Sequence, residues 1–298
     1  MTKYGRQTQN ALKGHQLAPK KRLGQNFLVN RNTAEAIVRA GNVTATDIIL
    51  EVGVGLGALT TPLAAAVQHV FGYEIDSGII RFHEEEGDLP ANVTLVHQDI
   101  LTADFQAIAK QCGGSLKILA NLPYSISNPF IFKLIDNAPL IDCATIMLQK
   151  EVADRLTALP SSKDYGVPTV LLACCARVKK LMTLKPAEFH PRPKIDSVVI
   201  HIDFATHRKL AEGNKGPSFD FSLLKKIVRT TFNQRRKTIL NTLSHSDCLG
   251  IPGEIDHPKK KQLTENAILA ADLSPAARPE TLTVADFIGL SRAIQQLQ

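Results

Sequence analysis

Three glycines at alternate positions, Gly53, Gly55 and Gly57, follow a short apolar run at 48–52. Glycine at a strand-to-helix turn lets the backbone approach a ligand closely and adopt φ values that other residues avoid. GxGxxG spacing would indicate a dinucleotide with its pyrophosphate at the helix N-terminus. The GxGxG spacing found here is common in methyltransferases, whose cofactor carries no phosphate. The loop is therefore a candidate cofactor site, and a tight structural turn is the alternative.

Two acids follow the next two predicted strands. Glu74 lies about 20 residues beyond the glycines, where a carboxylate can accept hydrogen bonds from both ribose hydroxyls. Asp99 can accept one from an adenine amino group. Ligands of open α/β sheets bind beyond the C-terminal ends of the strands. Either acid alone is more often a helix cap or a solvated loop residue, but acids after two consecutive strands favour an adenosyl cofactor.

The tetrapeptide Asn121-Leu122-Pro123-Tyr124 resembles that of amino-group methyltransferases acting on adenine. An adenine amine is a poor nucleophile because its lone pair is delocalised into the ring. The side-chain oxygen of Asn121 and the carbonyl of Leu122 can hold its two hydrogens and favour a pyramidal, electron-rich nitrogen. Tyr124 can stack on the base, and Pro123 stiffens the turn. Positioning for in-line attack then supplies most of the catalysis without a strong general base.

The elements that must position these residues form an alternating pattern. Short β-branched or apolar runs alternate with helical patterns, which indicates βαβ units and a parallel sheet, an α/β Rossmann-like fold. Strands are predicted at 48–52, 69–73, 93–97, 117–120, 145–149, 181–184 and 198–202. Helices are predicted at 58–67, 129–135, 151–159 and 170–176.

Near residue 205 the pattern changes. Residues 206–218 are polar and Gly-rich without clear periodicity, and helical spacing without strand alternation follows. We therefore predict a cofactor-binding catalytic domain at 1–205, with a basic segment at 1–34, and a small all-helical RNA-binding domain at 206–298.

Six segments, in order, resemble the family of ribosomal RNA adenine dimethyltransferases, and they span almost the whole chain. They comprise the tetrapeptide and the segments 23–28, 51–60, 147–153, 189–197 and 232–238. The resemblance implies a class I methyltransferase fold and S-adenosylmethionine as cofactor, with no metal. Val54 and Asn26 stand where the family often has Pro and His, at positions that shape the pocket without doing chemistry.

The resemblance also implies roles for individual residues. The methionine end of the cofactor would be lined by Gln25, Asn26 and Leu28, with Asn121 also close to the cofactor. Gly53 and Gly55 would hold the cofactor. Glu74 would bind the ribose of the cofactor, and Asp99 would bind its adenine. The target base would be held by the tetrapeptide and by Phe189, which would form the second face of an aromatic stack.

Basic residues suggest where RNA binds. The stretch 219–237 carries six Lys or Arg against the single acid Asp220, which fits a phosphate-binding face. A solvated helix face is the usual interpretation of such a run, but a base-methylating site nearby favours RNA. The predicted contacts are Lys20, Lys21, Arg22, Lys225, Lys226, Arg229, Arg235, Arg236 and Lys237.

The housekeeping members of this family dimethylate two adjacent adenines near the 3′ end of small-subunit ribosomal RNA, and the segments 193–197 and 232–238 favour that branch. The antibiotic-resistance members, which modify large-subunit ribosomal RNA, are the main alternative. A mitochondrial relative that serves transcription is another, which nothing in the sequence favours. Two alternatives lie outside methyl transfer. One is a dinucleotide-dependent oxidoreductase, which would need the GxGxxG spacing, and the other is a ribosome-assembly factor without catalytic activity.

Composition agrees with an RNA partner without requiring one. The chain has 298 residues, 44% of them hydrophobic, and 35 Lys and Arg against 28 Asp and Glu give a net charge of +7. Its five cysteines show no CxxC pair, and no run resembles a secretory signal or a membrane span. These features predict a soluble, cytoplasmic protein, and we expect a monomer.

Overall fold

A computed structural model describes residues 14, 19, 23–213, 219–247 and 256–297. These residues form two compact units. One unit runs through Ala153 and resumes at Ala176–Lys209, and the other combines Asp154–Cys175 with the described residues from Leu210 onward. None of the described helices has the length and apolar character needed to cross a membrane.

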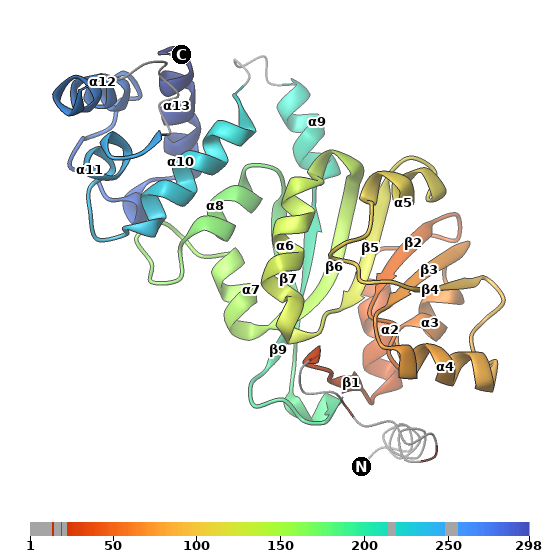
Figure 1. Ribbon diagram of the computed structural model, residues 1–298. Helices are drawn as coiled ribbons and strands as arrows, with labels where there is room; N and C mark the ends of the chain where they lie inside the picture. The colour runs from red at the N-terminus through yellow and green to blue at the C-terminus, as the bar shows by residue number, and fades with distance from the viewer. Residues whose placement is uncertain (1–13, 15–18, 20–22, 214–218, 248–255, 298) are drawn as a thin grey trace. The chain divides into compact units, whose positions relative to one another are not determined.

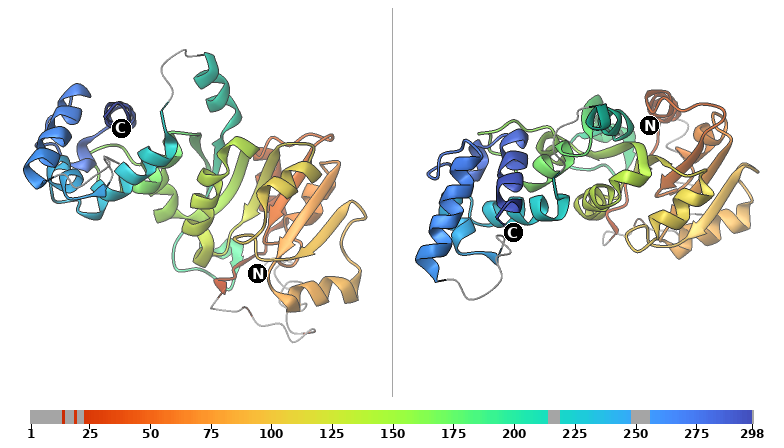
Figure 2. Two further views of the ribbon diagram at one scale, coloured as in Figure 1. Left: turned by 45° about the horizontal axis from the view of Figure 1, so that its top comes forward. Right: turned by 90° about the horizontal axis from the view of Figure 1, so that it is seen from above.

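The first unit is built on a seven-stranded sheet with helices on both faces, in the strand order β4-β3-β2-β5-β6-β9-β7 (Figure 1 and Figure 2). All seven predicted strands occur, and the α/β class is confirmed. The strands are β2 (Ile48–Val52), β3 (His69–Glu74), β4 (Val93–His97), β5 (Leu116–Asn121), β6 (Ile141–Gln149), β7 (Arg177–Leu184) and β9 (Ser197–Asp203).

The sheet is parallel from β4 to β6, as the βαβ pattern predicts, but not at the edge formed by β9 and β7. β9 runs antiparallel to both of its neighbours, β6 and β7. A parallel neighbour would require a crossover, usually a helix, between β7 and β9. The segment between these strands holds only the 3-10 turn Pro186–Glu188 and the two-residue strand β8, so the chain turns back instead.

The helices of the first unit are short, and two of them are capped by aspartate. Asp76 accepts a hydrogen bond from Gly78 N (2.9 Å) at the start of α4, and Asp104 accepts one from Gln106 N (2.8 Å) at the start of α5. The helices are α2 (Arg31–Ala40), α3 (Thr60–Ala64), α4 (Ser77–Glu86), α5 (Phe105–Gln111) and α6 (Ser127–Asp136), and both α7 (Lys150–Leu156) and α9 (Ala205–Gly213) begin in the first unit and end in the second.

Two very short strands tie the N-terminal segment to the catalytic unit. β1 (Phe27–Leu28) pairs antiparallel with β8 (Phe189–His190), so that Leu28 lies opposite Phe189. Both side chains are buried in the same apolar cluster as Ile37 of α2 and Leu63 of α3. This pairing fixes where the preceding residues, Gln25 and Asn26, enter the site.

The regular elements described in the second unit are all helical. They are α8 (Val167–Ala173), α10 (Phe221–Asn233), α11 (Ile239–Ser244), α12 (His257–Ala270), α13 (Val284–Gln295) and the 3-10 turn Pro279–Thr281. Residues 154–175 group with these helices rather than with the sheet. The domain boundary predicted at residue 205 would place them in the catalytic domain instead. Tyr165 explains the grouping, because its ring packs on Phe232 (6.0 Å between centroids) and its hydroxyl donates to Leu282 O (2.8 Å).

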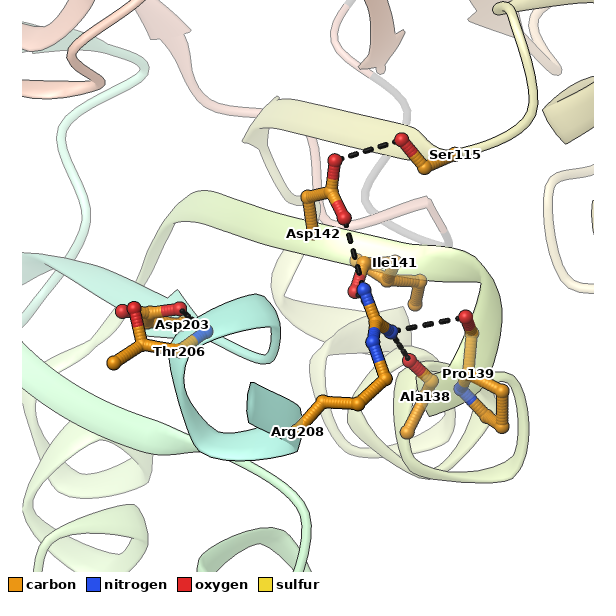
Figure 3. Close-up of polar contacts among 8 residues, drawn as sticks. All are labelled: Ser115, Ala138, Pro139, Ile141, Asp142, Asp203, Thr206 and Arg208. Carbon is orange, nitrogen blue, oxygen red and sulfur yellow. Dashed lines mark hydrogen bonds and ion pairs between the residues drawn. The ribbon is translucent and has the colours of Figure 1, made fainter. Parts of the chain in front are cut away.

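The segment after residue 205 also differs from expectation, since residues 205–213 form helix α9 despite their weak periodicity. Figure 3 shows how Arg208 holds this helix to the sheet. Its guanidinium donates to Pro139 O (2.9 Å) and to Asp142 Oδ1 (3.0 Å), and Ser115 Oγ donates to the other oxygen of Asp142 (2.7 Å). The first unit therefore extends to Lys209.

Candidate active site

A cavity lies beyond the C-terminal ends of β2, β3, β4 and β5. The predicted site residues that line it are Gln25, Asn26, Gly53, Gly55, Glu74, Asp99, Asn121, Leu122 and Pro123. Segments far apart in the sequence thus meet at the edge of the sheet where parallel strands end.

The glycine loop packs closely against its surroundings. Gly53 has φ of 79° and donates its N–H to Tyr73 O (2.9 Å), and a Cβ there would lie 3.3 Å from Asn121 O. Gly55 has φ of 55°, and a Cβ there would lie 3.2 Å from Phe27 Cδ1. A side chain at either position would be strained and crowded, so the loop keeps its backbone exposed to the cavity.

Glu74 is held by three backbone donors. One carboxylate oxygen accepts from Gly55 N (3.0 Å), and the other accepts from Ile75 N and Asp76 N (both 2.9 Å). Burial raises the pKa of this carboxyl group, and these three hydrogen bonds offset part of the rise. The carboxylate therefore has a fixed orientation at the wall of the cavity.

Asp99 is oriented by its own loop. Asp99 Oδ1 accepts from Leu101 N (2.8 Å), and Lys133 Nζ donates to the carbonyls of Leu101 (2.9 Å) and Ala103 (2.7 Å), which holds the loop in place. Two lining residues that the sequence patterns did not reveal are Ile75 and Ile100. Each directly follows one of the predicted acids, and an apolar side chain there suits a flat heterocycle.

The orientation of the Asn121 amide follows from its partner. Asn121 Nδ2 donates to Asn26 O (3.2 Å), and a carbonyl oxygen can bind only the amino side of an amide. Oδ1 is therefore the acceptor that Asn121 presents, and no donor in the described part of the chain bonds to it. Gln25 Nε2 donates to Asp76 Oδ2 (2.9 Å), so the N-terminal segment is also tied to the loop after β3.

Three predicted site residues do not line the main cavity. Leu28 and Phe189 are both 2% exposed and lie in the apolar core, although Leu28 also borders a smaller cavity beside Gly53. Tyr124 is half-buried, and its hydroxyl lies 2.8 Å from Ser197 Oγ. The described structure brings Asn121, Leu122 and Pro123 to the cavity but does not bring the two aromatic rings there.

Comparison with known proteins agrees with this geometry. Residues 17–276 match the model of the family described as ribosomal RNA adenine dimethylase. The chain belongs to this family. A family member from Desulfotalea psychrophila, named ribosomal RNA small subunit methyltransferase A, is 58% identical over 99% of this chain and 98% of its own length. A protein of the same name from Caldanaerobacter subterraneus is 38% identical over 93% of this chain and 98% of its own.

Solved structures show the class I methyltransferase fold. A dimethyladenosine transferase from Plasmodium falciparum superposes with a TM-score of 0.74 at 25% identity, covering 91% of this chain and 98% of its own. The 23S rRNA methyltransferase ErmE, with a TM-score of 0.62 at 22% identity, shares the fold over 91% of this chain and 100% of its own. The Rossmann-like fold predicted from the sequence is confirmed.

The predicted RNA contacts of this dimethylase family member fall into three groups. Lys226, Arg229, Arg236 and Lys237 are exposed, and Lys225 is half-buried. Lys20, Lys21 and Arg22 lie outside the described residues.

Within the described chain, no group of three or more His, Cys, Asp or Glu side chains could hold a metal ion.

Arg235 is engaged inside the second unit rather than displayed on its surface. Its Nε donates to Glu280 Oε2, and its two terminal nitrogens donate to the carbonyls of Lys163 (2.7 Å) and Ser162 (2.9 Å). These bonds use the guanidinium to join the loop before α8 to the turn before α13. The structure gives Arg235 an architectural role, which the run of basic residues did not reveal.

Glu51 is a buried carboxyl group directly before the glycine loop. It is fully buried, and neither oxygen has a hydrogen-bond partner among the described residues. Burial raises the pKa of Glu51 to about 8. The nearby Thr60 hydroxyl lowers this pKa in part, although it makes no hydrogen bond of regular geometry to the carboxyl group. The negative charge of Glu74 raises the pKa further. At neutral pH the carboxyl group is therefore mainly protonated in the folded protein.

We expect Glu51→Gln to stabilise the protein more at high pH than at low pH. Folded Glu51 keeps a proton that the unfolded chain releases between pH 4.5 and about 8, so its contribution to stability falls as pH rises through this window. Glutamine resembles the protonated acid and does not ionise. Thermal unfolding at about pH 5 and about pH 8 checks this, with Glu84→Gln on the exposed face of α4 as the control. A Tm difference independent of pH would contradict it.

Proposed function

We propose that this chain transfers methyl groups from S-adenosylmethionine to the N6 amino groups of two adjacent adenosines near the 3′ end of small-subunit ribosomal RNA. Asn121 supports this best, since its bond to Asn26 O leaves an amide oxygen as the acceptor beside the cavity. The relative with 58% identity carries the name of a small-subunit methyltransferase. On this proposal the protein acts as a monomer in the cytoplasm, during biogenesis of the small subunit.

The cavity suits an adenosyl cofactor. Glu74 is fixed with its carboxylate at the wall, where it can accept hydrogen bonds from ribose hydroxyls, and Asp99 can accept one from the adenine amine. Gly53 and Gly55 leave room that a side chain would fill. The methionine end would lie toward Gln25 and Asn26. When bound, the cofactor supplies an electrophilic methyl group on a cationic sulfur.

The chain itself supplies position and electron density. Asn121 Oδ1 and the Leu122 carbonyl would accept the two hydrogens of the adenine amine and direct its lone pair toward the methyl group. Pro123 limits the flexibility of the turn that presents both acceptors. The nitrogen becomes acidic once alkylated, so its proton can pass to solvent without a dedicated base. A second methyl transfer to the same nitrogen would require the monomethylated adenine to keep one hydrogen bond, from its remaining N–H to one of these two acceptors.

The stack of the Tyr124 and Phe189 rings on the target base is proposed to form when RNA binds. Tyr124 is the last residue of the tetrapeptide and is half-buried, whereas Phe189 is buried opposite Leu28. A base turned out of its RNA context would gain about 1–3 kcal/mol from stacking on one aromatic ring. Tyr124 belongs to the tetrapeptide, and Phe189 belongs to the β1–β8 pairing that ties the N-terminal segment to the site.

The exposed residues Lys226, Arg236 and Lys237 are proposed to bind RNA phosphates. Changing all three to glutamine should weaken RNA binding. The slope of log K against log salt concentration should also become shallower, by about 0.7–0.9 for each phosphate that is no longer neutralised. Filter binding of small-subunit RNA across a salt series measures this. Lys110→Gln, at an exposed position of α5, is the control. Arg235→Gln should instead lower Tm, and an unchanged salt slope in the triple variant would contradict the proposed face.

The proposed function is tested by incubating the protein with labelled S-adenosylmethionine and unmethylated small or large ribosomal subunits. Digestion of the RNA then identifies the labelled nucleoside. Dimethyladenosine from the small subunit alone supports the proposal. Label in the large subunit alone would keep the chemistry and change the substrate, and RNA binding without any label would favour a non-catalytic assembly factor.

A further inference from the structure

A buried histidine lies under the glycine loop and belongs to none of the predicted site residues. His83, in the last turn of α4, is 4% exposed. Its Nε2 lies 2.8 Å from Gly55 O, and its Nδ1 lies 2.6 Å from Asp88 Oδ1. Both ring nitrogens are therefore engaged, one by the loop that lines the cavity.

Gly55 is consequently held from two sides. Its N–H donates to Glu74 Oε2 (3.0 Å), and its carbonyl oxygen faces His83. Its φ of 55° is in the left-handed region, so the peptide orientation depends on such contacts as well as on the absence of a side chain. Glu74, the proposed ribose acceptor, and His83 are thus linked through one residue.

The end of α4 explains how Asp88 reaches the ring. Gly87 terminates the helix with φ of 58° and donates its N–H to His83 O (3.0 Å), so the chain turns back over the last turn. The Asp88 carboxylate is partly exposed and the imidazole is not. Gly55 O is an acceptor, so the ring bonds to it by donating from Nε2.

We propose that His83 is a positioning residue for cofactor binding. It does not line the cavity, but it fixes the Gly55 carbonyl, and thereby the N–H that orients Glu74, with a ring that Asp88 holds in place. The inference rests on the proposed cofactor site. It predicts that His83 affects affinity for the adenosyl cofactor and leaves the methyl-transfer step itself unchanged.

The test is calorimetric titration of S-adenosylmethionine into the whole protein. His83→Leu should weaken binding about tenfold, equivalent to about 1.4 kcal/mol. His83→Gln, which keeps one donor for Gly55 O, should recover part of the loss, and Asp88→Asn, at an exposed position, should cause a smaller loss. kcat at saturating cofactor and KM for RNA should stay unchanged. His69→Leu, at a histidine bonded to Thr94 at the start of β3, is the matched control.

A double-mutant cycle with Glu74→Gln separates positioning from general destabilisation. If His83 acts through Gly55 and Glu74, the two losses in affinity are less than additive, whereas independent effects add. Equal affinities for wild-type, His83→Leu and Asp88→Asn proteins, or strict additivity, would overturn the inference while the proposed function stands. Failure of the wild-type protein to bind the cofactor would instead overturn the proposed function, and the inference with it.

Discussion

Replacing Asn121 with alanine is expected to reduce the rate of methyl transfer by at least about a hundredfold, similar to the loss of one preorganised polar contact in other active sites. The variant removes the oxygen proposed to accept one amine hydrogen, so the nitrogen lone pair is no longer directed at the methyl group. Asn121 also lines the cofactor cavity, so a loss of cofactor affinity below about tenfold is expected alongside. Single-turnover methylation of small subunits at saturating cofactor measures the chemical step.

The matched control is Asn137→Ala. Asn137 follows α6 and donates its Nδ2 to Lys133 O (2.9 Å), so this variant also loses one asparagine hydrogen bond without touching the cavity. Small-subunit binding should be unchanged in both variants. If Asn121→Ala methylated as fast as Asn137→Ala, the acceptor role of Asn121 would be refuted. If neither variant nor the wild type methylated but all bound small subunits, the assembly-factor hypothesis would replace catalysis.

Local sequence patterns were sufficient to predict several of the residues that line the main cavity. Gly53, Glu74, Asp99 and Asn121 each stand at or just after the end of a strand whose apolar run is visible in the sequence. In parallel strands the C-terminal ends lie at one edge of the sheet, so strand ends that are distant in sequence become neighbours in space. The same reasoning placed all seven strands, with differences only at their ends.

Partners chosen by tertiary packing could not be predicted in this way. The reversal of β9 depends on the absence of a crossover helix, which a pattern of apolar runs does not reveal. Arg235 resembles its basic neighbours in the sequence, but only the fold brings Glu280 and two carbonyls to its guanidinium. His83 likewise gains its proposed role from Gly55, which lies 28 positions earlier in the chain. Tyr165 joins the helical unit because Phe232 and Leu282 O are there.

Replacing Glu74 with alanine is expected to weaken binding of S-adenosylmethionine at least about a hundredfold, or about 2.7 kcal/mol. Two hydrogen bonds from ribose to an ionised acceptor would be lost, and bonds to charged groups contribute about 1.5–3 kcal/mol each. Gly55, Ile75 and Asp76 would also lose the acceptor of their N–H groups, so the glycine loop should become less ordered. Calorimetric titration with the cofactor measures the affinity, and thermal unfolding measures the accompanying loss of stability.

The pH dependence of this affinity gives a second, independent readout. Because burial raises the pKa of Glu74, acidification protonates it at a higher pH than an exposed glutamate, and wild-type affinity should fall as pH is lowered from neutral. Glu74→Gln, which cannot ionise, should bind weakly at all pH values and lack this dependence, while exposed Glu84→Gln should behave as wild type. The same acid limb in Glu74→Gln would assign the titration to a group other than Glu74. A Glu74→Ala affinity within about threefold of wild type would exclude Glu74 as the ribose acceptor.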